Sequence, residues 1–132
     1  EMLNQARQRM PNAEFILSDF SAGLTKRLAG RLFDFIVITY ALHHLEYNKQ
    51  VKFLRSLLAL LKENGKILIG DICFETQSDL AACQKRFPGE WDEDEFYPIL
   101  SEIQQHLPET RVAYEVVSFC SGVVQISNSM VG

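Results

Sequence analysis

The feature that most constrains the fold is an apolar run, Phe33 to Ile38, that leads directly into polar and aromatic residues. The run reads FDFIVI and is interrupted only by Asp34. A segment that is apolar on both faces is typical of a buried parallel strand. The residues that follow, Thr39 to Leu45, read TYALHHL. Because open α/β sheets bind ligands at the carboxyl ends of their strands, this stretch predicts a central strand that leads into a binding site.

A helix and a second strand are predicted after this stretch. The helix runs from a cap at Asn48 to about Lys62, and its apolar residues have helical spacing: Val51, Leu54, Leu58 and Leu61. Asn64-Gly65 supplies a left-handed stop. The segment Lys66 to Ile72 (KILIGDI) is a second buried strand, and it carries Asp71 near its end. Strand, helix and strand form a right-handed βαβ unit, so the two strands are parallel. Asp71 is therefore expected at the same sheet edge as Thr39 to Leu45.

Three segments are predicted before the central strand. Met2 to Met10 has helical spacing and is stopped by Pro11-Asn12. Glu14 to Leu17 has the apolar run of a short strand, and Ser21 to Arg31 is a glycine-containing loop.

Two further helices and a hairpin are predicted after the second strand. Thr76 and Asp79 form the capping box of a helix that ends near Phe87. Pro98 is the expected first residue of a helix that runs to about His106. The inward-facing residues of this second helix are Ile99, Leu100, Ile103 and Leu107.

The last part of the chain is β-branched and aromatic. Arg111 to Phe119 and Val123 to Ile126 are strands joined by a Ser121-Gly122 turn. Two strands connected by so short a turn must be antiparallel, because a parallel pair needs a long crossover.

Composition limits the class of partner. Thirteen basic and 17 acidic residues give a net charge of −4, and no Lys/Arg cluster is present, so neither nucleic acid nor an anionic membrane is an expected partner. No apolar run approaches the length of a membrane helix. The three cysteines have no CxxC spacing, which fits free thiols in a reducing cytoplasm.

Four segments together resemble class I S-adenosylmethionine (SAM)-dependent methyltransferases. They are Ser18-Asp19-Phe20, Asp34-Phe35-Ile36-Val37, Ala41-Leu42-His43-His44-Leu45 and LLKENGKIL from Leu60 to Leu68. The resemblance runs from Glu1 to about Ser127 and implies a Rossmann-like α/β sheet, mostly parallel, with a C-terminal antiparallel hairpin.

The sequence departs from the family pattern in one respect. The glycine-rich turn GxGxG that holds the methionine part of the cofactor in this family does not occur in the chain. The resemblance therefore implies a single, partial methyltransferase-like domain, residues 1–132, with the first two strands absent. In the family these strands lie between the Glu14–Leu17 and Phe33–Ile38 strands, so the central strand is left with an unpaired edge. Either the rest of the domain lies elsewhere, or another element fills the gap, or the two strands pair directly.

The resemblance also implies a set of cofactor-binding residues. Asp19 would accept a hydrogen bond from the adenine amino group, and Phe20 would lie on the adenine ring. Thr39, Tyr40 and Ala41 would face the methionine part of SAM, where an aromatic face attracts the sulfonium cation. The competing interpretations are that Asp19 caps local amides, that Phe20 is a core residue and that Tyr40 is a packed strand end.

The substrate pocket is expected at His43, His44 and Asp71. His44 is the candidate general base, because imidazole exchanges protons near neutral pH. In the competing interpretations His43 caps the next turn and Asp71 is a hydrogen-bonded loop carboxylate. The two adjacent histidines lack the partner ligands of a metal site.

Two functions follow as expectations. The first is methyl transfer from SAM to a small-molecule acceptor, with weak cofactor binding by this chain alone because the glycine-rich turn is missing. The second is a non-catalytic α/β interaction domain that forms a homodimer or larger oligomer through the open sheet edge.

Overall fold

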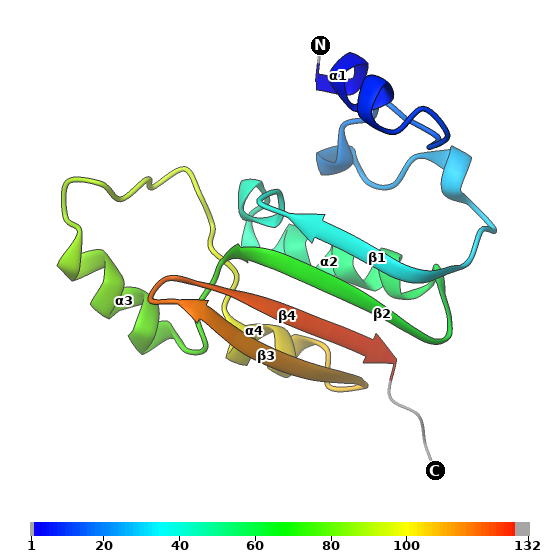
Figure 1. Ribbon diagram of the computed structural model, residues 1–132. Coiled ribbons are helices and arrows are strands. Elements are labelled where there is room, and N and C mark those ends of the chain that lie inside the picture. Colours follow the sequence, from blue (N-terminus) through cyan, green and yellow to red (C-terminus); the bar gives the residue numbers. More distant parts are fainter. Residues whose placement is uncertain (1, 129–132) are drawn as a thin grey trace.

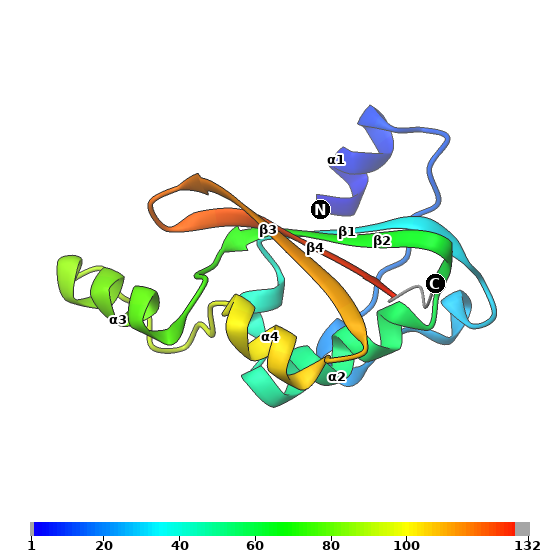
Figure 2. The same cartoon turned by 90° about the horizontal axis from the view of Figure 1, so that it is seen from below.

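The computed structural model describes residues 2–128, which form a four-stranded sheet with most of its helices on one face (Figures 1 and 2). Glu1 and residues 129–132, which the predicted domain includes, lie outside the described residues. The strands are β1 (Phe33–Thr39), β2 (Leu61–Ile72), β3 (Thr110–Ser118) and β4 (Ser121–Asn128), in the spatial order β1-β2-β4-β3. Helices α2 (Tyr47–Leu58) and α4 (Leu100–His106) lie beneath the sheet, and α1 (Met2–Arg9) lies on the other side (Figure 2).

The predicted βαβ unit is confirmed. Strands β1 and β2 are parallel, with Ile36 opposite Ile67 and Ile38 opposite Ile69, and α2 connects them. Helix α2 ends at Leu58, before the predicted end at Lys62.

Asn64 has the predicted left-handed φ of 69°, but it belongs to an irregular start of β2 instead of ending the helix. In this part the register jumps from Phe33–Leu61 to Phe35–Lys66. Gly65 is required here, because a Cβ would come within 2.9 Å of the carbonyl oxygens of Lys62 and Phe33.

The prediction that the first strand is buried on both faces is wrong. Ile36 and Ile38 pack against the core, whereas Phe35 and Val37 are each 63% exposed. The reason is that β1 pairs with β2 alone among the described strands, and that α1, on the side opposite α2 and α4, leaves Phe35 and Val37 largely uncovered.

The predicted strand from Glu14 to Leu17 does not form. These residues pair with no strand of the described sheet, and Leu17 is 88% exposed. An apolar run becomes a strand only where a neighbouring edge offers backbone partners, and the segment is not paired with β1. Direct pairing of the two segments is thereby excluded. Glu14 is held instead by Arg31, at 3.0 Å.

The predicted loop from Ser21 to Arg31 contains short helical turns. One, η1 (Phe20–Ala22), is capped by Asp19, and the other, η2 (Lys26–Leu28), is capped by Thr25.

The C-terminal hairpin is confirmed, and its two strands add two antiparallel pairs to the sheet. One strand pair is parallel and two are antiparallel, so the prediction of a mostly parallel sheet is wrong. The turn lies at Phe119-Cys120, two residues before the predicted Ser121-Gly122. Gly122 serves packing, because a Cβ at this position would lie 2.5 Å from Cε2 of Tyr114.

The two late helices form close to their predicted positions. Helix α3 (Gln77–Arg86) begins with the predicted capping box of Thr76 and Asp79. Helix α4 begins two residues after Pro98, because Ile99 has an extended backbone and forms the N-cap. The Pro98 carbonyl accepts a bond from the Phe74 amide, and Ile99 forms an isolated bridge with Phe74. The four predicted inward-facing residues of α4 are buried.

The helix-covered face of the sheet holds the main core. Its most buried members are Leu42, Leu54, Ile67, Ile69, Leu107 and Ile126. Across the described part of the chain, no helix has both the length and the apolarity needed to span a membrane.

Candidate functional site

The carboxyl ends of β1 and β2 lie side by side, with Thr39 opposite Gly70. Tyr40 follows β1, and its amide still donates to the Gly70 carbonyl at 2.9 Å. Its φ is 49°, a left-handed conformation that costs roughly 1–3 kcal/mol for a residue with a side chain. The Tyr40 side chain is 64% exposed, so the interpretation of Tyr40 as a packed strand end is wrong.

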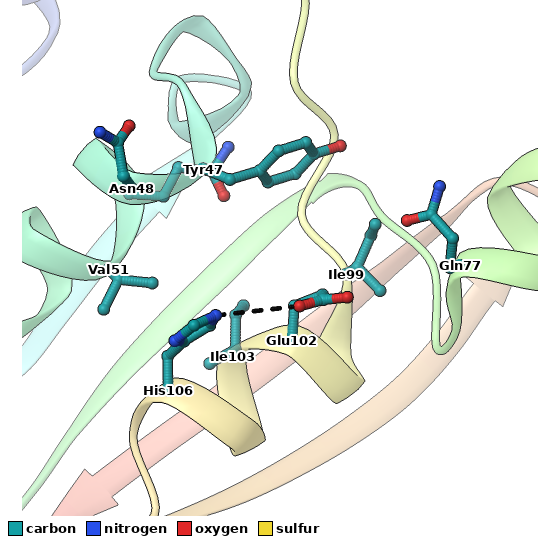
Figure 3. A pocket seen from close by; sticks show the side chains of 9 residues that line it. Tyr47, Asn48, Val51, Gln77, Ile99, Glu102, Ile103 and His106 are labelled. Carbon is teal, nitrogen blue, oxygen red and sulfur yellow. Dashed lines mark ion pairs between the residues drawn. The ribbon is translucent and has the colours of Figure 1, made fainter.

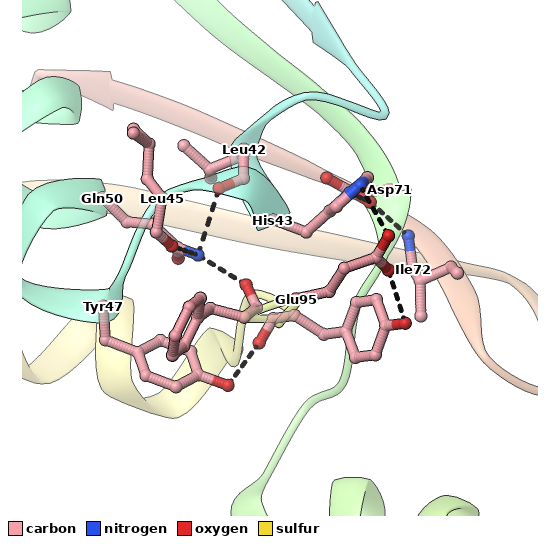
Figure 4. Close-up of polar contacts among 10 residues, drawn as sticks. Leu42, His43, Leu45, Tyr47, Gln50, Asp71, Ile72 and Glu95 are labelled. Atoms are coloured by element: carbon pink, nitrogen blue, oxygen red, sulfur yellow. Dashed lines mark hydrogen bonds and ion pairs between the residues drawn. The ribbon is translucent and has the colours of Figure 1, made fainter. Parts of the chain in front are cut away.

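A buried hydrogen bond joins a residue that follows β1 to a residue at the carboxyl end of β2. His43 lies in the short helix η3 (Leu42–His44), and its Nδ1 is 2.8 Å from Oδ1 of Asp71 in β2 (Figure 4). The same Asp71 oxygen accepts a 2.8 Å bond from the Ile72 amide. This oxygen is therefore an acceptor, and His43 donates through Nδ1–H. In a neutral imidazole this arrangement leaves Nε2 as the proton acceptor.

Two further side chains approach the other side of His43. Glu95 Oε1 lies 3.7 Å from His43 Nε2, and the Tyr97 hydroxyl donates to Glu95 Oε2 at 2.6 Å. Burial raises the pKa of Tyr97, and the bond to Glu95 raises it further, so the phenol remains a donor. The Phe96 amide donates to the His43 carbonyl at 2.7 Å, which fixes this loop to η3.

Glu95 and Tyr97 were missed by reasoning from the sequence. The acidic run Asp92 to Glu95 indicates a solvated loop, and nothing in its spacing points to a histidine 52 residues earlier. Only the folded chain brings the two segments together.

Asp71 has an unusual second oxygen. The side chain is fully buried, yet Oδ2 has no hydrogen-bond partner among the described residues. Buried polar atoms without a partner are rare, and each one costs roughly 1–3 kcal/mol. Asp71 is therefore a carboxylate that costs stability at this position. Its bond to the Ile72 amide does not account for that cost, and its other partner is His43.

His44 is placed differently from His43. It is exposed, its side chain makes none of the hydrogen bonds found among residues 2–128, and its ring centroid lies 4.2 Å from that of His43 with the two rings tilted by 50°. Of the three residues predicted for the substrate pocket, the structure therefore brings His43 and Asp71 together and leaves His44 at the surface.

In this structure Asp19 caps local amides and Phe20 packs against the core, as the competing interpretations of these two residues expect. Asp19 caps η1 by accepting bonds at Oδ1 from the Ser21 amide (3.0 Å) and hydroxyl (2.6 Å). These two bonds lower the pKa of Asp19, so the exposed carboxyl is ionised. Phe20 packs against Phe53, with 5.4 Å between ring centroids.

The segment after Asp19 nevertheless lies beside the segment after β1. A cavity of about 160 Å³ is lined by both Phe20 and Leu45. Asp19 Oδ2 accepts none of the bonds found among the described residues, so it is free to accept one from a ligand.

The comparisons with known proteins agree with this architecture. Residues 1–116 match a protein family described as a methyltransferase domain. An uncharacterized methyltransferase of Alkaliphilus oremlandii is 28% identical over 104 residues, which are 79% of this chain and 44% of that protein. A second, from Oceanobacillus iheyensis, is 30% identical over 106 residues, covering 75% of this chain and 48% of that protein. The chain spans about half the length of these curated relatives.

The fold also matches solved structures. DhpI, solved in complex with SAM and HEP, superimposes with a TM-score of 0.68 over 95% of this chain and 62% of its own. The sequence identity is 14%, so the likeness concerns the fold.

Proposed function

The chain belongs to the methyltransferase domain family, and from that premise we propose that it forms the later part of an enzyme that transfers a methyl group from SAM to a small-molecule acceptor. The observation that carries the proposal is the buried bond between His43 Nδ1 and Asp71 Oδ1, which joins the ends of two parallel strands. Ligands of α/β sheets bind at this edge. The likeness to DhpI, solved with SAM, supports the choice of cofactor.

The residues proposed to hold SAM have suitable chemistry. When bound, SAM supplies an electrophilic methyl group on a cationic sulfonium. Asp19 offers an ionised carboxylate with a free oxygen for an exocyclic amine, and Phe20 lies next to it. Tyr40 offers an exposed ring that attracts a cation, within the turn formed by Thr39, Tyr40 and Ala41.

We assign the proton-accepting role to His43 in place of His44. Methylation of an O–H or N–H group would release a proton from the acceptor molecule, with S-adenosylhomocysteine as the other product. His43 Nε2 takes this proton, and the carboxylates of Asp71 and Glu95 stabilise the imidazolium that results. General-base catalysis of this kind contributes roughly 10²–10⁴ in rate.

Cofactor binding is the direct test. We expect S-adenosylhomocysteine, the product form of the cofactor, to bind the chain weakly, with saturation in the millimolar range in ligand-observed NMR. Asp19→Ala should remove this binding, whereas Asp34→Ala, a change of the same charge outside the site, should leave it unchanged. Micromolar binding in calorimetry would show that the glycine-rich turn is dispensable. Saturable binding that Asp19→Ala does not weaken, or no binding at all, would overturn the proposed cofactor site.

A second candidate function has one observation in its favour. Phe35 and Val37 expose apolar side chains on a strand whose outer edge is unpaired in the described sheet. Such an edge is a template for pairing with another chain. The alternative is therefore a non-catalytic interaction domain that forms a homodimer through β1, and a stable dimer without cofactor affinity would favour it.

We also propose a setting for the protein. The net charge of −4 and the lack of a basic cluster argue against nucleic acid and anionic membranes as partners. Cys73, Cys83 and Cys120 are free thiols, which accords with a reducing cytoplasm.

A further inference from the structure

A cavity of about 460 Å³ lies between α2, α4 and the start of α3, and none of the residues assigned above to cofactor or acceptor lines it. This volume is within the range of small-molecule sites. Figure 3 shows side chains entering from three elements: Tyr47, Asn48 and Val51 from α2, Glu102, Ile103 and His106 from α4, and Gln77 from α3. Ile99 and Ile103 are buried and form an apolar floor, with Val51 beside them.

Gln50 supplies an unused hydrogen-bond acceptor at this cavity. It lines the cavity and is only 2% exposed. Its Nε2 donates to the carbonyls of Leu42 (3.2 Å), Leu45 (2.9 Å) and Phe96 (2.6 Å). Three carbonyl partners fix the amide orientation, because the other amide atom must then be the oxygen. Gln50 Oε1 accepts none of the hydrogen bonds found among residues 2–128, so a buried wall residue holds a free acceptor.

The charged group of the cavity is also an acceptor. Glu102 is half-exposed, and its closest ionic partner among the described residues is His106, 3.9 Å away. An exposed pair at this distance satisfies the carboxylate weakly. Burial raises the pKa of Tyr47, and the negative charge of Glu102 raises it further, which indicates that Glu102 acts electrostatically across the cavity.

His106 is the one basic side chain among the lining residues, and its ring lies 3.9 Å from the Glu102 carboxylate. Neither lysine nor arginine is among the residues that line the cavity. The nearby Arg55 is already engaged, because its guanidinium bonds the Glu109 carboxylate and the His106 carbonyl, each at 2.6 Å.

We propose that this cavity is a second small-molecule site, separate from the strand-end site, and that it takes a compact apolar molecule carrying one protonated amine. The apolar part would lie on Val51, Ile99 and Ile103. The ammonium group would donate to the Glu102 carboxylate and to Gln50 Oε1. Charge-assisted hydrogen bonds are roughly twice as strong as neutral ones, so an amine is favoured over an alcohol of the same shape.

Benzylamine is a suitable probe, because it joins a small apolar ring to an ammonium group. We expect it to shift the NMR signals of the Val51 and Ile103 methyl groups in a saturable manner. Benzyl alcohol should bind at least about tenfold more weakly at the same residues, and benzoate should not bind. Equal affinity for benzylamine and benzyl alcohol, or no saturable shift at Val51 and Ile103, would overturn the proposal.

Two variants test the contribution of the Glu102 charge separately from that of the cavity volume. Glu102→Gln should weaken benzylamine binding about tenfold and leave benzyl alcohol unaffected, whereas Glu63→Gln, the same charge change at an exposed residue outside the cavity lining, should alter neither. Val51→Trp fills the space and should abolish both. If Val51→Trp does not fold, Glu102→Gln decides alone, and unchanged benzylamine affinity in that variant contradicts the proposed site.

Discussion

At the scale of single residues, the most informative pair is His43 and Asp71. Histidines side by side in a sequence suggest equal roles, but the fold gives them opposite environments: His43 is buried against a carboxylate, and His44 is exposed. Two residues that are 28 positions apart thus become one hydrogen-bonded pair, because parallel strands bring their carboxyl ends to one edge.

The Asp71 contact should fix the tautomer of His43. We expect the ring of His43 to carry its proton on Nδ1 in the neutral form, which long-range ¹H–¹⁵N NMR spectra detect directly. In Asp71→Ala the preference should shift toward the Nε2–H form that is common in free histidine, while the signals of the distant His106 stay unchanged as an internal control. An Nε2–H tautomer in the unaltered protein would contradict the role given to His43.

Gly122 is a residue at which packing, not backbone conformation, excludes a side chain. A Cβ there would lie 2.5 Å from the Tyr114 ring and 2.7 Å from the Glu115 carbonyl. Gly122→Ala should therefore lower the free energy of unfolding by about 1–3 kcal/mol in urea denaturation.

The matched control for this substitution is Gly89→Ala, because no atom lies within 4 Å of a Cβ at position 89. Equal stabilities of the two variants would show that β3 and β4 separate more easily than the structure implies.

At the scale of elements, local sequence patterns predicted correctly those elements that are stabilised by contacts among their own residues. The Thr76–Asp79 capping box predicted α3, and all of its bonds form, with Thr76 Oγ1 accepting from the Asp79 amide at 3.2 Å. The Glu14–Leu17 segment shows the opposite case. Its apolar residues are strand-like, but a strand is defined by its neighbours, and none is available to it among the described residues.

The cap can be tested without disturbing the core. Thr76→Ala removes the side chain that accepts from the Asp79 amide and should destabilise the protein by about 1 kcal/mol. Ser78→Ala, an exposed change in the first turn of the same helix, should be neutral or slightly stabilising. Circular dichroism during urea denaturation measures both, and a neutral Thr76→Ala would mean that α3 contributes nothing to global stability.

At the scale of the whole molecule, the described sheet has two edges of different kinds. β3 ends the sheet as part of a hairpin, whereas β1 is the edge that carries Phe35 and Val37. Because β1 exposes apolar side chains at an unpaired edge of the described sheet, association with another polypeptide at that edge is expected.

We therefore expect concentration-dependent self-association, measured by light scattering after size-exclusion chromatography. Val37→Lys should shift the equilibrium toward the monomer, because a charge on an edge strand disfavours pairing. Val116→Lys places the same charge on β3 at a residue of similar exposure (65% against 63%) and should have no effect. An equal response of both variants would locate the association away from β1.

The sequence by itself determined the elements whose signals are local. It predicted α1, the βαβ unit, the capped α3, the inward face of α4 and the terminal hairpin, because spacing, caps and turn residues act over a few positions. It also placed Asp71 and the residues after β1 at one edge, since parallel strands require it. The tertiary structure decided what depends on distant neighbours. It exposed one face of β1, left Glu14–Leu17 unpaired, buried His43 while exposing His44, and brought Glu95 close to His43. These outcomes depend on which segments the folded chain sets side by side, and no local pattern contains that information.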